Sequence, residues 1–172
     1  MAALVGGALL AASFPPYDLV WLAPAGLALL TLAWHGTRAR TGLLLGLLGG
    51  LAFFVPLLDW MRVIGDDAWL ALATYCALWW ALLAAGVAVT SRLRWWPLAV
   101  PLLWVGQEFF RDRYPLGGFP WGRLAFGQTD TLLTPYAALG GAPAVTFAVA
   151  LIGSLLAWLV LRARSAPPRR TV

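Results

Sequence analysis

The feature that most constrains this chain is the length of its segments without any acidic or basic residue. Six such segments make up most of the 172 residues, namely 1–17, 19–37, 41–58, 68–91, 95–107 and 131–161. A helix needs about 20 mostly apolar residues to cross a membrane, with a tolerated range of roughly 17 to 25. Only 11% of the residues are charged, whereas soluble domains carry roughly 25%. The sequence therefore predicts a protein whose main solvent is lipid.

We expect an all-α fold, a polytopic membrane helical bundle of about six helices within residues 1–161. The first helix is expected to be incomplete, because Phe14-Pro15-Pro16 interrupts it before it has the length of a span, unless the native chain begins earlier. The expected helices are 1–14, 19–36, 41–59, 68–91, 95–111 and 142–161. Residues 112–141 are expected to form an outer-face interfacial loop, and residues 162–172 a basic cytoplasmic tail.

The arginines predict an orientation, because loops on the cytoplasmic side of membrane proteins are enriched in positive charge. All 12 basic residues of this chain are arginines. Those without a nearby acid fall in alternate loops and in the C-terminal segment: Arg38, Arg40, Arg92, Arg94, Arg162, Arg164, Arg169 and Arg170. The remaining arginines share the opposite loops with the aspartates. We therefore expect a multi-pass protein whose N- and C-termini are both cytoplasmic.

Several classes of site are excluded by residues that the chain lacks. Without any lysine, it cannot provide a Schiff-base lysine, a Walker lysine or a Glu-Lys-Cys hydrolase triad. Cys76 and His35 are the only residues of their types, which excludes a disulfide framework and a clustered Cys/His metal site. We expect no metal and no cofactor. The arginines fall in pairs between apolar runs rather than along one face, so no nucleic-acid partner is expected either.

Three glycines recur every four residues in the third apolar segment. Gly42, Gly46 and Gly50 would share one face of a helix, where the backbone of another helix can approach closely. This spacing is typical of helix packing in membranes, which is the role that we expect for them.

The segment from residue 107 to residue 141 is too apolar for a solvated loop and too rich in Gly and Pro for another span. Glu108 and Arg111 are three residues apart, so on a helix they would share a face and could neutralise one another. They are interpreted as a structural ion pair or as part of a functional site. The sequence of residues 118–121, Gly-Phe-Pro-Trp, combines a permissive backbone with a rigid turn and two aromatics. It would line an acyl-chain groove, dock another domain or serve as an interfacial anchor.

A set of short motifs runs in order along almost the whole chain. They are Phe14-Pro15-Pro16-Tyr17-Asp18, the run from Gly46 to Trp60, Glu108-Phe109-x-Arg111, Gly118-Phe119-Pro120-Trp121, and Gly127-Gln128-x-Asp130 leading to Gly140. In order and spacing, this set resembles the membrane region of apolipoprotein N-acyltransferase, the last enzyme of bacterial lipoprotein maturation.

The resemblance implies a bacterial cytoplasmic (inner) membrane protein. In that family, eight helices carry a nitrilase-like domain on the outer face. A cysteine takes an acyl chain from a phospholipid, with a glutamate as base and a lysine supporting the oxyanion, and the chain passes to the N-terminal diacylglyceryl-cysteine of a lipoprotein. None of these three residues can be carried over, since Cys76 lies in a membrane segment and Glu108 in another motif. We therefore expect a membrane region that is inactive alone: a truncated gene product, an excised fragment or one piece of a split protein.

By the same resemblance, the candidate contacts with phospholipid or lipoprotein substrate are Glu108, Arg111, Phe119, Pro120, Trp121 and Gln128. A separately encoded nitrilase-like domain would then be a partner. The alternative is a non-catalytic membrane anchor or partner for a polyprenol-phosphate mannosyltransferase or another separate glycosyltransferase. A small transporter ranks last, because the sequence has neither a charge pair at the membrane centre nor an internal repeat.

Overall fold

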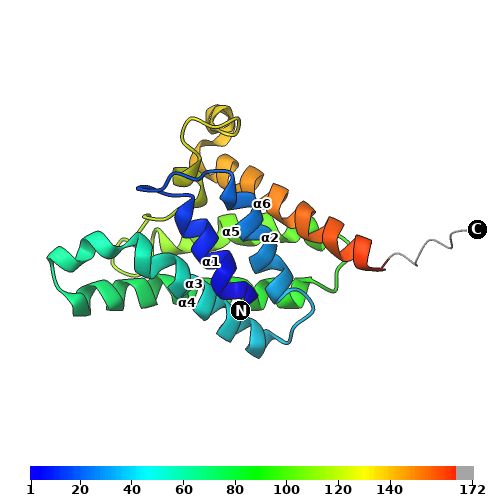
Figure 1. The fold of residues 1–172 in the computed structure, drawn as a ribbon, viewed down its shortest axis with the longest axis horizontal. Helices are drawn as coiled ribbons and strands as arrows, with labels where there is room; N and C mark the ends of the chain where they lie inside the picture. Colours follow the sequence, from blue (N-terminus) through cyan, green and yellow to red (C-terminus); the bar gives the residue numbers. More distant parts are fainter. Residues whose placement is uncertain (166–172) are drawn as a thin grey trace, which may run out of the picture.

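The computed structural model describes residues 1–165, and these residues form a helical bundle without any strand (Figure 1). The elements in chain order are α1 (Ala2–Ala12), α2 (Leu22–Trp34), α3 (Ala39–Leu57), η1 (Asp59–Val63), α4 (Asp66–Thr90), α5 (Trp96–Arg111), η2 (Leu124–Gln128), η3 (Thr134–Tyr136) and α6 (Ala137–Ser165), where η denotes a 3₁₀ helix. The predicted all-α membrane bundle is thus confirmed.

The helices of the bundle fall into two groups by length. Within residues 1–165, three segments are long and apolar enough to cross a membrane: Ala39–Leu57, Asp66–Thr90 and Thr134–Ser165. Helix α1 has 11 residues and is therefore about 16 Å long, roughly half of the hydrocarbon thickness. Helix α2 has 13 residues, fewer than expected, because the chain between α1 and α2 turns until Trp21 before helical geometry resumes.

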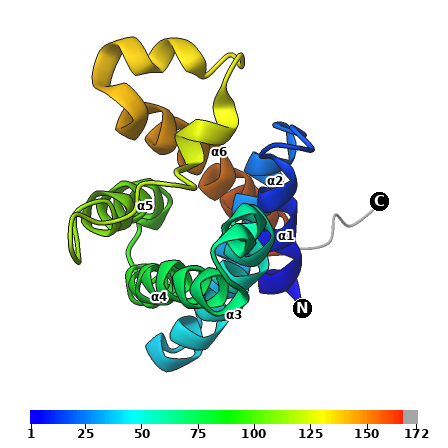
Figure 2. The same ribbon diagram turned by 90° about the vertical axis from the view of Figure 1, so that its left-hand side faces the viewer.

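Successive helices alternate in direction, which gives the bundle two distinct ends. We call the end with η1 and residues 112–136 the loop end. The opposite end, toward the right of Figure 1, is the arginine end. Its described arginines are Arg38, Arg40, Arg92, Arg94, Arg162 and Arg164. Figure 2 shows residues 112–136, in yellow-green to gold, projecting beyond α5 and α6.

Helices α3 and α4 pack most closely where glycines lie on α3. A Cβ atom on Gly42 would lie 2.9 Å from the carbonyl oxygen of Ala84, and one on Gly50 would lie 2.8 Å from Cα of Ala77. A Cβ atom on Gly46 would lie 2.6 Å from Cβ of Ala84. The bare glycine backbones thus allow close packing, and this pair of helices forms the base of the bundle (Figure 2).

Large aromatic side chains fill the centre of the bundle. Trp80 on α4 stacks on Phe53 of α3 at 4.9 Å between ring centroids and meets Trp104 of α5 edge-on, also at 4.9 Å. Trp34 of α2 lies 6.2 Å from Trp104. Aromatic pairs in these offset and edge-on arrangements add attraction beyond their buried area. The cluster joins four helices at the centre of the bundle.

The last helix extends further than predicted at both of its ends. Helix α6 includes residues 137–141, which we expected in the loop, and it continues through Arg162 and Arg164 to Ser165. It is kinked at Gly140 and Gly141, where φ of Gly141 is +65°. Pro143 follows, and since proline has no N–H it fits the first turn of a restarting helix, near the predicted start at 142. The rest of the expected tail, including Arg169 and Arg170, lies outside the described residues.

Candidate functional site

At the loop end, Arg111 holds residues 112–123 against the bundle. Its side chain is fully buried in the last turn of α5, with the guanidinium carbon 5.5 Å from the centroid of the Phe54 ring. Nη1 donates hydrogen bonds to the carbonyl oxygens of Phe119, at 2.8 Å, and Trp121, at 2.6 Å. In a region without regular structure, these two carbonyl groups would otherwise be unsatisfied. Arg111 is therefore a positioning residue for the chain on both sides of Pro120.

Gly118 allows the tight turn that brings this chain back to α5. Its φ is +72°, in the left-handed region that favours glycine, and a Cβ atom there would collide with the backbone between Arg111 and Arg113. The N–H of Phe119 donates to the carbonyl oxygen of Arg111 at 2.9 Å. The backbone and the side chain of Arg111 thus hold the same short segment.

Glu108, one turn before Arg111, joins three elements. It is 4% exposed, and its Oε1 accepts a hydrogen bond from the N–H of Leu124 at 2.9 Å. Oε2 accepts one from the hydroxyl of Thr146 at 2.8 Å. Both side-chain oxygens of Glu108 are thus satisfied by donors within the protein. Glu108 on α5 therefore fixes the start of η2 and the first half of α6.

The ion pair that we predicted between Glu108 and Arg111 is absent from the described residues, and this prediction is wrong. Each side chain is instead bound by groups distant in sequence, so the two do not meet although they share a face of α5. The acid nearest to Arg111 is Asp112, at 4.0 Å from Nη2, and Asp112 itself pairs with Arg123. Asp112 thus lies between Arg111 and Arg123 and offsets part of their positive charge.

An apolar cavity of about 380 Å³ opens beside this anchored segment. Trp121 and Trp60 of η1 form one side of it, with their rings edge-on at 5.8 Å between centroids. The residues that line it come from α3, η1, η2 and the chain after α1 and after α5: Phe14, Pro15, Leu57, Trp60, Trp121, Gly122 and Phe126. Its volume is within the range of roughly 300–1,000 Å³ that is usual for ligand pockets. With half of Trp121 exposed, the cavity is accessible to an apolar ligand.

Arg123, the residue after Gly122, lines a second and more polar cavity of about 290 Å³. Glu108, Arg113 and Arg123 line it together with Val105, Phe109 and Pro143. Arg113 donates a hydrogen bond to the carbonyl oxygen of Phe109 and lies over its ring, at 3.7 Å from the centroid. Arg113 and Arg123 place positive charge at this cavity, whereas both oxygens of Glu108 already accept hydrogen bonds from Leu124 and Thr146. Residues 121–123 thus contribute to an apolar and a polar cavity.

The predicted contact residues have different positions in this arrangement. Trp121 lines the apolar cavity and Glu108 the polar one, whereas Arg111 is buried behind the segment that they share. Phe119 is half-buried against the core, and Pro120 is exposed. Gln128 is buried and closes η2 locally, since its Nε2 donates to the carbonyl oxygen of Gly127 at 2.8 Å. Phe119, Pro120 and Gln128 line neither cavity.

Sequence reasoning did not select several residues that line these cavities. Phe14 and Trp60 belong to the motifs that carried the resemblance, and Arg113 and Arg123 were assigned only as loop charges. The aromatic residues near the loop-end turns indicated that these positions matter. The sequence does not show which of them pack together. In the part of the chain that the structure describes, no group of three His, Cys, Asp or Glu side chains could hold a metal ion.

The comparisons with known proteins agree on one family. Residues 6–155 match the model described as "Apolipoprotein N-acyltransferase N-terminal domain". Among curated relatives, an apolipoprotein N-acyltransferase of Mycolicibacterium smegmatis is 47% identical over 163 residues, which are 92% of this chain and 27% of the relative. The apolipoprotein N-acyltransferase of Chromobacterium violaceum is 35% identical over 92% of this chain and 33% of the relative. That of Methylococcus capsulatus is 33% identical over 93% of this chain and 35% of the relative.

The chain thus spans about a quarter to a third of the length of these relatives. The match covers both cavities and the two anchoring residues of α5, because it extends from α1 into the second half of α6. A family model that matches most of the chain establishes its membership. The chain belongs to the apolipoprotein N-acyltransferase family, whose N-terminal membrane domain it matches.

Proposed function

We propose that this membrane domain holds an acyl chain of a membrane phospholipid in the apolar cavity at the loop end, for an N-acyltransferase reaction on lipoproteins. The observation that carries the proposal is the cavity itself, which is lined by Trp60, Trp121 and Phe126 and open beside a segment that Arg111 holds in place. Apolar walls of this kind favour a hydrocarbon ligand. The names of the relatives support the reaction class, since each is called apolipoprotein N-acyltransferase.

The polar cavity complements this role. A phospholipid acyl donor has a phosphate near the carbonyl groups from which its chains extend, and Arg113 and Arg123 line the polar cavity. We propose that these arginines face the donor headgroup while the chain enters beside Trp121. Phe119, Pro120 and Gln128 would then act by shaping the segment rather than by touching lipid.

We further infer that the loop end faces the outer side of a bacterial inner membrane and that both termini are cytoplasmic. The arginine end supports this orientation, because its described loops and the last turns of α6 contain arginines and no acid. An introduced cysteine at Ser91 should be shielded from an impermeant thiol reagent in intact cells, and one at Gly65 should be labelled, both with Cys76 replaced. The reverse pattern would contradict the orientation.

Photo-crosslinking tests the acyl-chain site directly. The purified chain would be reconstituted in nanodiscs containing a phospholipid with a diazirine at the end of one acyl chain, and adducts would be located by mass spectrometry. We expect adducts on the segments around Phe14, Trp60 and Trp121, and we expect Trp121→Ala to reduce them about fivefold. Trp21→Ala is the matched control, because Trp21 is exposed and lines neither cavity. Equal labelling in the two variants would contradict the proposal.

A chimera links the cavity to the reaction. Residues 1–165 would replace the corresponding part of the Mycolicibacterium smegmatis relative, and acyl transfer to a diacylated peptide would be measured. Trp121→Ala should lower the rate of transfer while protein abundance stays constant, because Trp121 is half exposed and contributes little to bundle stability. A loss of both abundance and activity would instead show that Trp121 is structural.

A further inference from the structure

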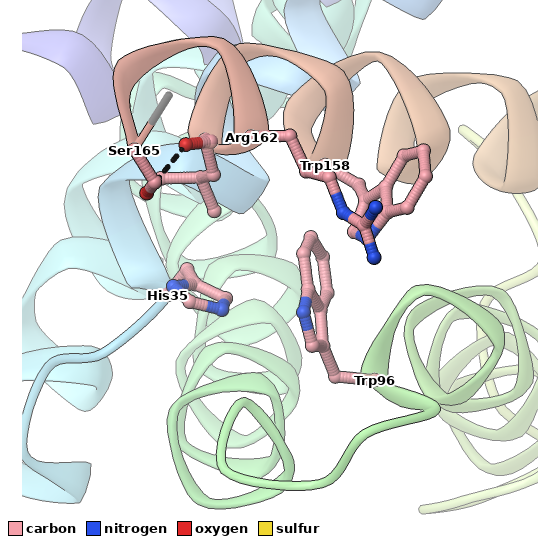
Figure 3. Close-up of a pocket in the computed structure, with 6 residues that line it drawn as sticks. His35, Trp96, Trp158, Arg162 and Ser165 are labelled. Carbon is pink, nitrogen blue, oxygen red and sulfur yellow. Dashed lines mark hydrogen bonds between the residues drawn. The ribbon is translucent and has the colours of Figure 1, made fainter. Parts of the chain in front are cut away.

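A pocket of about 450 Å³ lies at the arginine end, on the opposite side of the bundle from the cavities described above. Figure 3 shows the side chains that face it: His35 at the end of α2, Trp96 at the start of α5, and Trp158, Arg162 and Ser165 on the last turns of α6. Leu161 completes the lining. Three helices that are far apart in sequence thus contribute to one pocket.

Two polar side chains that line this pocket, those of Arg162 and His35, are available to bind a ligand. Arg162 lies over the ring of Trp158, at 4.4 Å from the centroid, and no acid of the described residues is within 4.0 Å of it. Nε2 of His35 is buried and has no hydrogen-bond partner among the described residues. A buried polar atom without a partner costs about 1–3 kcal/mol, so a ligand oxygen at this position would be favourable.

His35 also has the right protonation state to bind without adding a buried charge. Burial lowers the pKa of His35, so its imidazole is neutral at pH 7. Its ring lies 4.5 Å from that of Trp96, between centroids, which orients the imidazole beside an aromatic wall (Figure 3). A neutral imidazole has one N–H donor and one acceptor nitrogen.

The charge around the pocket favours an anion. The N–H of Gly36 donates to the hydroxyl of Ser91 at 3.2 Å and so joins the loop after α2 to the loop after α4. Arg38 and Arg40 lie at the end of the first loop and the start of α3, Arg92 and Arg94 lie in the second loop, and the described residues of this end contain no aspartate or glutamate. The positive charge is therefore not neutralised within the described part of the bundle.

We propose that this pocket binds the phosphate headgroup of an anionic glycerophospholipid. Arg162 donates to the phosphate oxygens, Nε2 of His35 bonds a headgroup or ester oxygen, and Trp96 and Trp158 flank the glycerol. A lipid is favoured over free phosphate because two tryptophans and Leu161 line the pocket where apolar helices end, which is the place of interfacial aromatics. Basic pockets between membrane helices on the cytoplasmic side are a recognised setting for anionic headgroups.

Native mass spectrometry and thermal unfolding in detergent test the site with stated probes. Dioleoyl-phosphatidylglycerol should bind and raise the unfolding temperature, whereas dioleoyl-phosphatidylcholine and inorganic phosphate should do neither. Arg162→Gln should weaken binding of phosphatidylglycerol about fivefold. His35→Phe keeps a ring against Trp96 but removes Nε2, and it should weaken binding about threefold.

The matched control is Arg40→Gln, since Arg40 is an exposed arginine of the same end that does not line the pocket. It should change the affinity less than twofold. Equal losses in Arg162→Gln and Arg40→Gln would overturn the proposal in favour of diffuse attraction between charges. Equal binding of phosphatidylcholine would exclude an anionic headgroup site, and stabilisation by inorganic phosphate alone would assign the pocket to a free anion. Helix content by circular dichroism confirms that each variant is folded.

Discussion

The two ends of the bundle are built from the same residue types, arginine and tryptophan, with opposite results. At the loop end, Arg111 is buried and bonded to two carbonyl groups, Arg123 pairs with Asp112, and Arg62 lies between Asp59 and Asp66. At the arginine end, no described arginine has an acid within 4.0 Å. Arg111 and Arg123 hold the loop in place through partners within the chain, whereas the described arginines of the opposite end have no acid of the chain to bind. Substitutions at each end can test this difference.

The largest expected effect comes from Arg111→Met. Methionine keeps part of the apolar volume but leaves the carbonyl groups of Phe119 and Trp121 without their donor, so the free energy of unfolding should fall by about 3–5 kcal/mol. Unfolding in mixed SDS micelles measures this loss. Arg113→Met is the control, because Arg113 is exposed, and it should cost less than about 1 kcal/mol. Equal losses would show that Arg111 is not the anchor of the loop end.

A second test compares this polar anchor with a close contact between α3 and α4. Gly46→Ala places a Cβ atom 2.6 Å from that of Ala84, so α3 and α4 must separate, and we expect a loss of about 2 kcal/mol in the same assay. Gly106→Ala has open space around its Cβ and should be neutral or stabilise α5 by about 0.5–1 kcal/mol. If Gly46→Ala costs more than Arg111→Met, the bundle depends more on helix contact than on its polar anchor.

Glu108→Gln should have a smaller effect, of about 1 kcal/mol. Glutamine retains an acceptor for the N–H of Leu124, and the hydroxyl of Thr146 can rotate to accept from the new amide. Because Glu108 is not bonded to Arg111, the arginine keeps both of its carbonyl partners. A double-mutant cycle with Thr146→Val isolates the contact between α5 and α6. A coupling energy near zero would contradict the role assigned to Glu108.

The smallest expected effect is that of Arg162→Gln on stability. In detergent without anionic lipid, the free energy of unfolding should change by less than about 0.5 kcal/mol, because Arg162 is exposed and has no acid partner to lose. The same thermal assay with and without phosphatidylglycerol separates stability from binding. A large loss without lipid would show that Arg162, like Arg111, supports the fold, and the contrast between the two ends would disappear.

The local sequence pattern was enough to predict the helices, because each apolar run between charged or proline-rich turns is long enough to form a helix. The aromatic core was not predictable in the same way. Trp34, Trp80 and Trp104 meet although they lie on α2, α4 and α5, and nothing in the local sequence shows that these three pack together. Which faces of two helices meet depends on packing between segments that are distant along the chain.

The candidate site shows the same limit. The spacing of Glu108 and Arg111 in the sequence correctly placed them on one face of α5. The partner that it predicted for each side chain was wrong. Thr146, which binds Glu108, follows it by 38 residues, and the carbonyl groups that bind Arg111 belong to a loop without a repeating pattern. Opposite charges at helical spacing attract weakly, by about 0.2–0.5 kcal/mol, so buried backbone groups that need a donor can take precedence.

The contact between Arg111 and the loop has a further consequence for how deep that loop can lie. In a soluble protein, water would solvate the carbonyl groups of Phe119 and Trp121, but hydrocarbon offers no donor, and irregular backbone is tolerated there only where protein satisfies it. Arg111 gives these two groups an internal substitute for water that moves with them. We therefore expect the shape of the Trp121 wall to change little when the bilayer around this loop thickens or thins.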